Sequence, residues 1–304
     1  MSNVSLYLIN KIYKKINHYN FYLRSKKTSA LIRELMNNKK LISIIDIGAG
    51  NRYLKTLLNF DGSADITMVD PNKNLEWAIK NLKSNLKYPE NVKGFKCGIG
   101  NKTGKKNYFL ASTSTGSTFV NIYKTKKKIN ENYFGPKNII KTNIYSLKDF
   151  VKNFNIKNPD IIKIDVEGFE KKIIESILKY FKPLIIEVEL NSNHPLYGDS
   201  FSIIHSKLKL SNYELVTFVP NYGAENKSCK IGNNENPIYR STVNQMDCIY
   251  VNKKITNNAK KLSIFLGYGL IDQAKIVFKK IKNKIPRLEK KINIFLEKLT
   301  KKIN

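Results

Sequence analysis

The stretch Ile161–Glu170, with the sequence IIKIDVEGFE, places the strongest constraint on what this chain can fold into. A run of β-forming residues leads into Asp165 and Glu167, and Gly168 opens a predicted helix. An apolar run that ends in acidic residues at a strand-to-helix junction indicates a buried parallel strand with carboxylates at its carboxyl end. Open α/β sheets bind their ligands at this edge. The stretch therefore predicts both a parallel sheet and the position of its ligand site.

Strands and helices alternate along the middle of the chain, which favours βαβ units and an α/β fold with a mostly parallel sheet. Strands are predicted at residues 41–51, 65–71, 92–100, 138–145, 160–166, 183–190, 213–219 and 246–251, with 105–110 as a short antiparallel partner of the third. Helices are predicted at residues 53–58, 72–87, 146–154, 168–180 and 201–210. The last two strands lack an intervening helix, which gives the sheet an antiparallel edge strand.

Two helical extensions flank the domain at residues 41–252. Residues 1–40 form the N-terminal extension, and residues 253–304 form a basic C-terminal extension with a predicted helical hairpin and a final amphipathic helix. The apolar residues of that final helix recur at helical spacing. They pack on the protein or pair with another chain, or else the helix lies on an anionic membrane. The sequence alone leaves these alternatives open.

The formal net charge of +30 suggests a nucleic-acid or anionic-membrane partner, but its composition weakens the first of these. Nearly all the basic residues are Lys, whereas groove and phosphate readers rely on Arg. The chain has Arg only at Arg24, Arg33, Arg52, Arg240 and Arg287. The positive excess also lies mainly in the two extensions. We therefore do not expect a nucleic-acid partner.

Cysteine usage and hydropathy point to a reduced compartment. The three cysteines are widely spaced and form no CxxC pair. The sequence has no signal-peptide pattern and no apolar run near the roughly 20 residues of a spanning helix. We expect a cytoplasmic protein, or one peripheral at the inner face of the membrane.

A glycine turn follows the first predicted strand and is matched by an acidic residue on the second. Asp46, Gly48 and Gly50 let a ligand approach the backbone, and Asp70 stands where a carboxylate can bind ribose hydroxyls. The dinucleotide fingerprint requires a third glycine where this chain has Tyr53, whose bulk obstructs close helix-strand packing. The pattern therefore favours a nucleoside methyl donor over a dinucleotide, with a purely structural turn as the alternative.

Several motifs together resemble the FkbM family of S-adenosylmethionine-dependent methyltransferases. They are DIGAGN, VDP, CGIGNKTG, the Ser/Thr loop at 111–119, IIKIDVEGFE, PLIIEVE and DCIYVNK. The resemblance covers residues 41–252 and implies the class I methyltransferase (Rossmann-like) fold with seven strands, S-adenosylmethionine as cofactor, and usually O-methylation. Members more often have Gly-Ala-Asn after the first strand, where this chain has Gly48-Ala49-Gly50-Asn51.

The resemblance also implies which residues bind the donor. The implied cofactor-binding residues are Asp46, Gly48, Ala49, Gly50, Asn51, Asp70 and Gly98. Methyl transfer to a hydroxyl is an in-line displacement that needs alignment of the oxygen and removal of its proton. We assign Asp165 to orienting the donor or the acceptor and Glu167 to the role of base. The alternative is that both carboxylates only stabilise the start of a helix.

Five further residues are candidates for the acceptor site, namely Ser117, Thr118, Glu187, Glu189 and His194. The two glutamates alternate on one strand and so share a face. With Asp165 they offer hard oxygen ligands for a divalent ion, but carboxylates at an exposed strand end are more often solvated, and we assign no metal. The small polar loop at 111–119 is a candidate to close over the acceptor, with a flexible turn as the alternative.

The resemblance implies O-methylation of a sugar hydroxyl in a surface polysaccharide or glycolipid, or in a related small polyol. One alternative is an RNA methyltransferase, for which the sequence has neither an Asn/Asp-Pro-Pro-aromatic tetrapeptide nor a Pro-Cys nucleophile. Another is a non-catalytic nucleotide-binding scaffold. Donor binding and methyl transfer distinguish the three.

Overall fold

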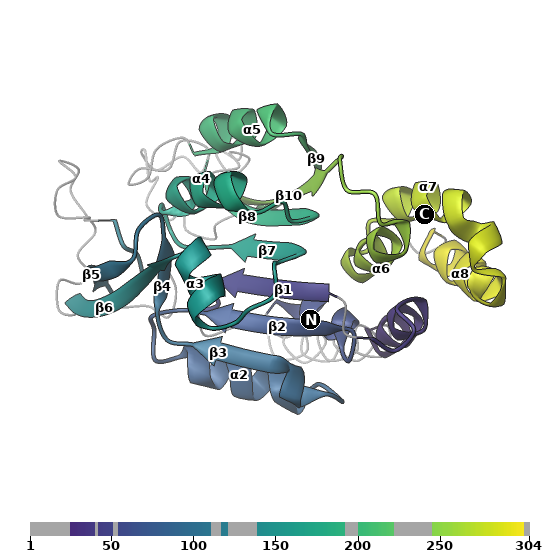
Figure 1. The fold of residues 1–304 in the computed structure, drawn as a ribbon, viewed down its shortest axis with the longest axis horizontal. Coiled ribbons are helices and arrows are strands. Elements are labelled where there is room, and N and C mark those ends of the chain that lie inside the picture. The colour runs from purple at the N-terminus through teal and green to yellow at the C-terminus, as the bar shows by residue number, and fades with distance from the viewer. Residues whose placement is uncertain are drawn as a thin grey trace, which may run out of the picture.

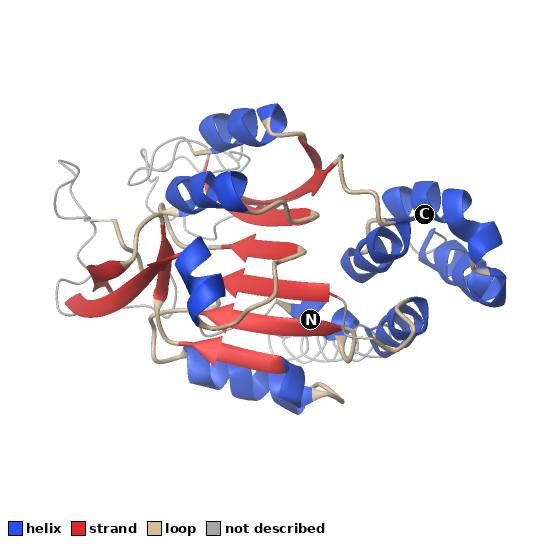
Figure 2. Ribbon diagram, viewed as in Figure 1, coloured by secondary structure: helices blue, strands red, loops and turns tan. Residues whose placement is uncertain are grey.

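The computed structural model describes residues 25–39, 42–50, 54–110, 117–120, 139–191, 200–221 and 245–300. Its centre is a seven-stranded sheet with the order β3-β2-β1-β7-β8-β10-β9 (Figures 1 and 2). The strands are β1 (Ile42–Ile47), β2 (Ala64–Val69), β3 (Val92–Phe95), β7 (Ile161–Ile164), β8 (Ile185–Asn191), β9 (Tyr213–Asn221) and β10 (Gln245–Asn252).

The first five strands in this order are parallel, and β10 is antiparallel to both β8 and β9. The antiparallel strand therefore lies one place in from the edge, and β9 is outermost. This order and these directions make the class I methyltransferase fold. The α/β fold with a mostly parallel seven-stranded sheet is thus confirmed.

Helices cover both faces of the sheet. One face packs against α3 (Leu147–Asn153), α4 (Glu170–Tyr180) and α5 (Phe201–Leu210), with a continuous apolar core beneath them. The other face packs against a second core shared by the helical residues 25–35, the 3₁₀ turn η1 (Lys55–Phe60) and α2 (Leu75–Ser84). The N-cap Ser146 accepts a hydrogen bond from the backbone N–H of Asp149, as the sequence predicts for the start of α3.

The predicted strand at residues 92–100 is wrong in one respect, because it is two strands in two sheets. β3 ends at Phe95, and β4 (Gly98–Gly100) joins a small sheet of order β4-β6-β5 with β5 (Gly104–Phe109) and β6 (Ile139–Ser146). The antiparallel partner of β5 is β6, and not the strand before it. A Cβ at Gly98 would lie 2.3 Å from the ring of Phe119, so β4 depends on glycine for its packing.

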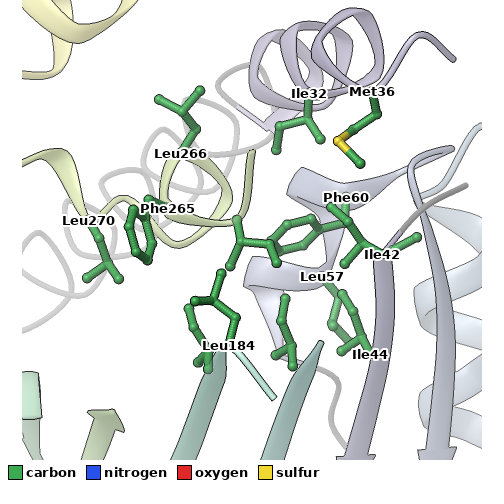
Figure 3. Packing of buried hydrophobic residues seen from close by; sticks show 14 of the residues in the cluster. Ile32, Met36, Ile42, Ile44, Leu57, Phe60, Leu184, Phe265, Leu266 and Leu270 are labelled. Atoms are coloured by element: carbon green, nitrogen blue, oxygen red, sulfur yellow. The ribbon is translucent and has the colours of Figure 1, made fainter. Parts of the chain in front are cut away.

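The C-terminal extension consists of α6 (Asn258–Tyr268), α7 (Ile271–Ile281), the 3₁₀ turn η6 (Lys282–Lys284) and α8 (Pro286–Thr300). It lies beside the amino ends of the central strands (Figure 1). Figure 3 shows Phe265, Leu266 and Leu270 of the extension in one apolar cluster with Phe60 and Leu184. The extension therefore shares a core with the sheet.

Close packing fixes α6 against η1. A Cβ at Gly267 would lie 2.2 Å from the Phe60 ring, and Asn59 donates a hydrogen bond to the carbonyl of Gly267 over 2.6 Å. Gly269 then ends the helix in the left-handed conformation, with φ 71°. In α8 the apolar residues Ile292, Leu296 and Leu299 are buried, as expected of a helix that packs on the protein. None of the described helices has the length and apolar character needed to cross a membrane.

Candidate active site

Three charged residues form a row across the centre of the sheet. Asp46 of β1 is the register neighbour of Lys163 of β7, which in turn neighbours Glu187 of β8. Asp46 is 1% exposed and Glu187 is 6% exposed. The ammonium Nζ of Lys163 lies 3.6 Å from Oδ1 of Asp46. Sequence reasoning missed Lys163, although a lysine inside the otherwise apolar run IIKI is the signal that could have found it.

A second group of carboxylates lies at the end of β7. Lys163 donates to Oδ2 of Asp165 over 3.0 Å. Asp165, Glu167 and Glu189 each place one carboxylate oxygen within 4.8 Å of the other two. The site thus concentrates acidic side chains at the carboxyl edge of the sheet, and a bound cationic group favours their ionised forms. The geometry also suits a hard divalent ion, but a group of acidic residues alone assigns no metal.

A strained turn connects this group to α4. Glu167 has φ 50° and Gly168 has φ 89°, so a non-glycine residue adopts the left-handed conformation at a functional position. The buried carboxylate of Glu170 accepts a hydrogen bond from the N–H of Gly168 over 2.9 Å, and Thr118 donates to the carbonyl of Glu167 over 2.6 Å. The helix begins at Glu170, and not at Gly168 as predicted, because these bonds hold the preceding turn.

Burial determines the protonation of these carboxyls. It raises the pKa of Glu167 to about 8, and the charges of Asp165 and Glu170 add to the effect. It also raises the pKa of Glu189 to about 10, again with Asp165 as the nearest charged neighbour. A carboxyl whose pKa lies near the working pH is well suited to accept a proton and later release it. Glu167 therefore has the properties of a general base.

Lys163 keeps its charge in this buried position. Burial by itself lowers the pKa of an ammonium, but Asp165, Asp46 and Glu187 together raise the pKa of Lys163 well above its ordinary value. Lys163 in turn lowers the pKa of Asp46 and Glu187, against the larger effect of burial, which raises both. Lys163 and these three acidic residues therefore form one electrostatic network, in which the lysine offsets part of the negative charge.

The turn after β1 and the end of β2 form the donor side of the site. Asp70 accepts hydrogen bonds from the N–H groups of Gly50 over 2.9 Å and Asn72 over 2.7 Å, one on each oxygen. Because a carboxylate oxygen has two lone pairs, each can accept a further bond from a ligand hydroxyl. A Cβ at Gly48 would lie 1.7 Å from the carbonyl oxygen of Asp165, so glycine is required where β1 meets β7. At Gly50 the same position is open, with the nearest atom 4.0 Å away.

These features fit a nucleoside donor with a cationic side chain. Neither carboxylate oxygen of the buried Asp46 has a hydrogen-bond partner among the described residues. The pKa values of Asp46 and Asp70 are raised first by burial, with added repulsion from Asp165. The three aspartates therefore lie close enough to affect one another's charge. Vicinal hydroxyls would satisfy Asp70, and positively charged groups would balance Asp46 and Asp165.

Two predicted acceptor residues have structural roles instead. Thr118 is fully buried, and its hydroxyl donates to the Glu167 carbonyl and accepts from the N–H of Val120. Glu187 is not at an exposed strand end, because it accepts a hydrogen bond from the hydroxyl of Tyr268 over 3.0 Å beneath the extension. Both side chains are used in hydrogen bonds within the protein, and we no longer assign them to the acceptor site.

The other predicted residues divide into three groups. Glu189 lies in the carboxylate group, and it is buried although we expected a solvated position. Gly98 packs beneath a phenylalanine, and Ala49 is buried in the turn after β1. Asn51 and His194 lie outside the described residues.

Tyr108 of β5 is a site residue that sequence reasoning missed. Its side chain hydrogen bonds with that of the predicted Ser117. Burial raises its pKa well above the ordinary value, and the nearby charges of Asp70, Glu167 and Asp165 contribute. Its hydroxyl is therefore close enough to the acidic residues of the site to be affected by their charge. No local pattern in β5 distinguishes it from a core tyrosine.

Comparison with known proteins gives one family and several distant structures. Residues 46–215 match the family described as Methyltransferase FkbM domain. The methyltransferase FkbM from Methylobacillus flagellatus KT is 14% identical with a TM-score of 0.39, and the match covers 70% of this chain and 44% of that one. This chain therefore spans less than half the length of that protein.

A second solved structure is similar at the same level. The precorrin-6y C5,15-methyltransferase from Geobacter metallireducens GS-15 is 14% identical with a TM-score of 0.36, and the match covers 75% of this chain and 86% of that one. No curated protein matches the sequence.

Proposed function

This chain belongs to the FkbM methyltransferase family, and we propose that it methylates a hydroxyl of a sugar in a surface polysaccharide or glycolipid, or of a related small polyol. The protein is an S-adenosylmethionine-dependent methyltransferase with the class I fold. Transfer to oxygen is supported above all by the position of Glu167, a largely buried carboxyl with a pKa of about 8 beside Asp165 at the carboxyl edge of the sheet. S-adenosylmethionine, when bound, supplies an electrophilic methyl carbon.

The residues of the chain divide the remaining tasks. Asp70 binds ribose hydroxyls, and Asp46 attracts the cationic end of the donor, because its carboxylate oxygens have an ion pair with Lys163 but no hydrogen-bond partner among the described residues. Asp165 orients the reacting groups, and Lys163 fixes the Asp165 carboxylate by donating a hydrogen bond to it. Glu167, in its ionised form, accepts the proton of the acceptor hydroxyl as the hydroxyl oxygen bonds to the methyl carbon and the carbon-sulfur bond of the donor breaks, so that a neutral thioether leaves.

An RNA acceptor is the second candidate, and the net charge of +30 is the observation in its favour. The charge around Glu167 argues against it. The acidic side chains of Asp165, Glu167 and Glu189 gather at this edge, and each of them repels a phosphate backbone when it is ionised. A neutral polyol meets no such repulsion and can hydrogen bond to them.

Labelled methyl transfer into fractionated host glycans, glycolipids and RNA tests the proposal. We expect label in a glycan or glycolipid fraction, and a loss of about 100-fold or more in the variants Asp165→Asn and Glu167→Gln. Glu175→Gln is the matched control, because Glu175 pairs with Lys207 on the exposed surface of α4. Wild-type rates in both site variants would refute the assignment of the residues, and label in RNA alone would refute the acceptor.

A further inference from the structure

A buried chain of polar groups connects the C-terminal extension to Asp165. It begins at Tyr268, whose hydroxyl donates to Oε2 of Glu187 over 3.0 Å. Glu187 is the register neighbour of Lys163 and attracts its ammonium. Lys163 then donates to Oδ2 of Asp165 over 3.0 Å and lies 3.6 Å from Asp46. Four elements, α6, β8, β7 and β1, each contribute to this chain.

Lys163 can hold two carboxylates of the donor site at once. An ammonium has three protons on a flexible stem and acts as a point charge with several partners. Among the described residues, Asp46 and Asp165 each form an ion pair with Lys163. If the ammonium were removed, the buried Asp46 would lose its nearest positive charge and Asp165 would lose its hydrogen-bond donor.

Contacts at the end of α6 restrict Tyr268, so that it can position Glu187. It is the last residue of α6, and Gly269 ends the helix directly after it. The preceding Gly267 is pressed against Phe60, whose ring centroid lies 6.1 Å from that of Tyr268. These contacts restrict the tyrosine ring, and the bond from its hydroxyl orients the carboxylate of Glu187, the register neighbour of Lys163.

We propose that Lys163 and Tyr268 are positioning residues of the donor site, and that the C-terminal extension completes this site through Tyr268. Lys163 sets the orientation of Asp165 and Asp46, and Tyr268 supports Lys163 through Glu187. Among the described residues, Asp247 of β10 also interacts electrostatically with Lys163. The inference rests on the family's methyl donor and not on the identity of the acceptor.

A buried ion pair that only stabilises the fold would have different effects, and the chain offers a matched control for each residue. Lys260 of α6 donates to both carboxylate oxygens of Asp160, over 2.9 and 3.0 Å, just before β7 begins. Tyr213 donates its hydroxyl to the carbonyl of Pro183 over 3.0 Å. Both controls resemble the site residues in chemistry but lie away from the carboxyl edge of the sheet.

The test for Lys163 is calorimetric titration of S-adenosylmethionine into wild type, Lys163→Gln and Lys260→Gln between about pH 6 and about pH 9. We expect Lys163→Gln to weaken binding by about 10- to 100-fold. Binding of the cationic donor strengthens as the carboxyls ionise. In Lys163→Gln this should occur at a higher pH than in wild type, because an ammonium no longer lowers the pKa values of Asp46 and Glu187. Lys163→Arg should restore much of the wild-type pH profile. Lys260→Gln should bind as wild type does.

Tyr268→Phe and Tyr213→Phe test the contribution of the extension. Tyr268→Phe should weaken donor binding by about 3- to 10-fold and shift the profile in the same direction, because Tyr268 lowers the pKa of Glu187. Tyr213→Phe should leave binding unchanged. The role of Lys163 would be overturned if Lys163→Gln had the donor affinity and the pH profile of wild type. The role of the extension would be overturned if Tyr268→Phe bound the donor as Tyr213→Phe does. Wild-type protein that binds the donor but labels no glycan would refute the proposed acceptor alone.

Discussion

Glu167 should make the stability of the free protein depend on pH in a direction opposite to that of an ordinary ion-paired carboxylate. Burial raises its pKa from 4.5 to about 8 in the folded protein, whereas the unfolded chain keeps the ordinary value. Between these values the folded state binds more protons than the unfolded state, so the free energy of unfolding falls as the pH rises. Glu167→Gln removes the titrating group and with it this loss of stability.

The size of the effect follows from the shift in pKa. One pKa unit corresponds to about 1.4 kcal/mol, so a rise from 4.5 to about 8 gives an upper limit of about 5 kcal/mol at high pH. Glu167 keeps partial access to water, which screens the penalty. We therefore expect Glu167→Gln to be more stable than wild type by about 2 kcal/mol near pH 9, and to match it near pH 4, where both side chains are neutral.

Urea unfolding at about pH 4, 7 and 9 measures this difference, with the donor left out so that only the free protein is compared. Glu175→Gln, on the exposed surface of the same region, should differ from wild type by no more than about 0.5 kcal/mol at each pH. A Glu167→Gln variant that is equally stable to wild type at all three values would refute the raised pKa. A variant less stable at high pH would show that the carboxylate is stabilised, and not strained, in the fold.

Three further outcomes follow from the packing. Gly48→Ala should lower the free energy of unfolding by several kcal/mol or prevent folding, because its Cβ would lie 1.7 Å from the carbonyl oxygen of Asp165. Gly50→Ala has open space at its Cβ and should lower the free energy of unfolding by only about 1 kcal/mol in the same urea assay. Gly267→Ala should lose about 1–3 kcal/mol, and Phe60→Leu in the same chain should recover part of this loss in a double-mutant cycle. Anionic vesicles should co-sediment with the protein only at low salt and release it at about 0.5 M, because Ile292, Leu296 and Leu299 of α8 are buried and, apart from Ile294, the exposed side chains of that helix are mostly charged.

The donor side of the site could be predicted because it depends on local signals. Asp46, Asp70 and Asp165 each follow or end an apolar strand, and parallel strands bring their carboxyl ends to one edge. The glycine at position 48 is likewise visible in the sequence, although the structure gives it a different reason. Its missing Cβ lets β1 approach the backbone of Asp165, and the open space for a ligand lies at Gly50.

The supporting residues could not be predicted because they depend on contacts between distant segments. Tyr268 meets Glu187 across 81 positions of the chain, and nothing in the helix pattern of α6 distinguishes that tyrosine from a core residue. The burial of Glu187 has the same origin, since the extension covers a strand position that looks exposed when β8 is read alone. Glu170 differs from these two residues because it lies within the motif IIKIDVEGFE. Its hydrogen bond from the N–H of Gly168 nevertheless depends on the geometry of the turn, which the motif does not specify.

The charges in the site show what Lys163 contributes among the surrounding acidic residues. Asp46, Asp165, Glu167 and Glu189 would repel one another if all were ionised, and burial raises the pKa of three of them, Asp46, Glu167 and Glu189. Lys163 offsets part of this repulsion. The acidic side chains at the carboxyl edge, where they are ionised, attract a cationic donor more strongly than the neutral thioether left after transfer. The same arrangement therefore favours binding of the substrate and release of the product.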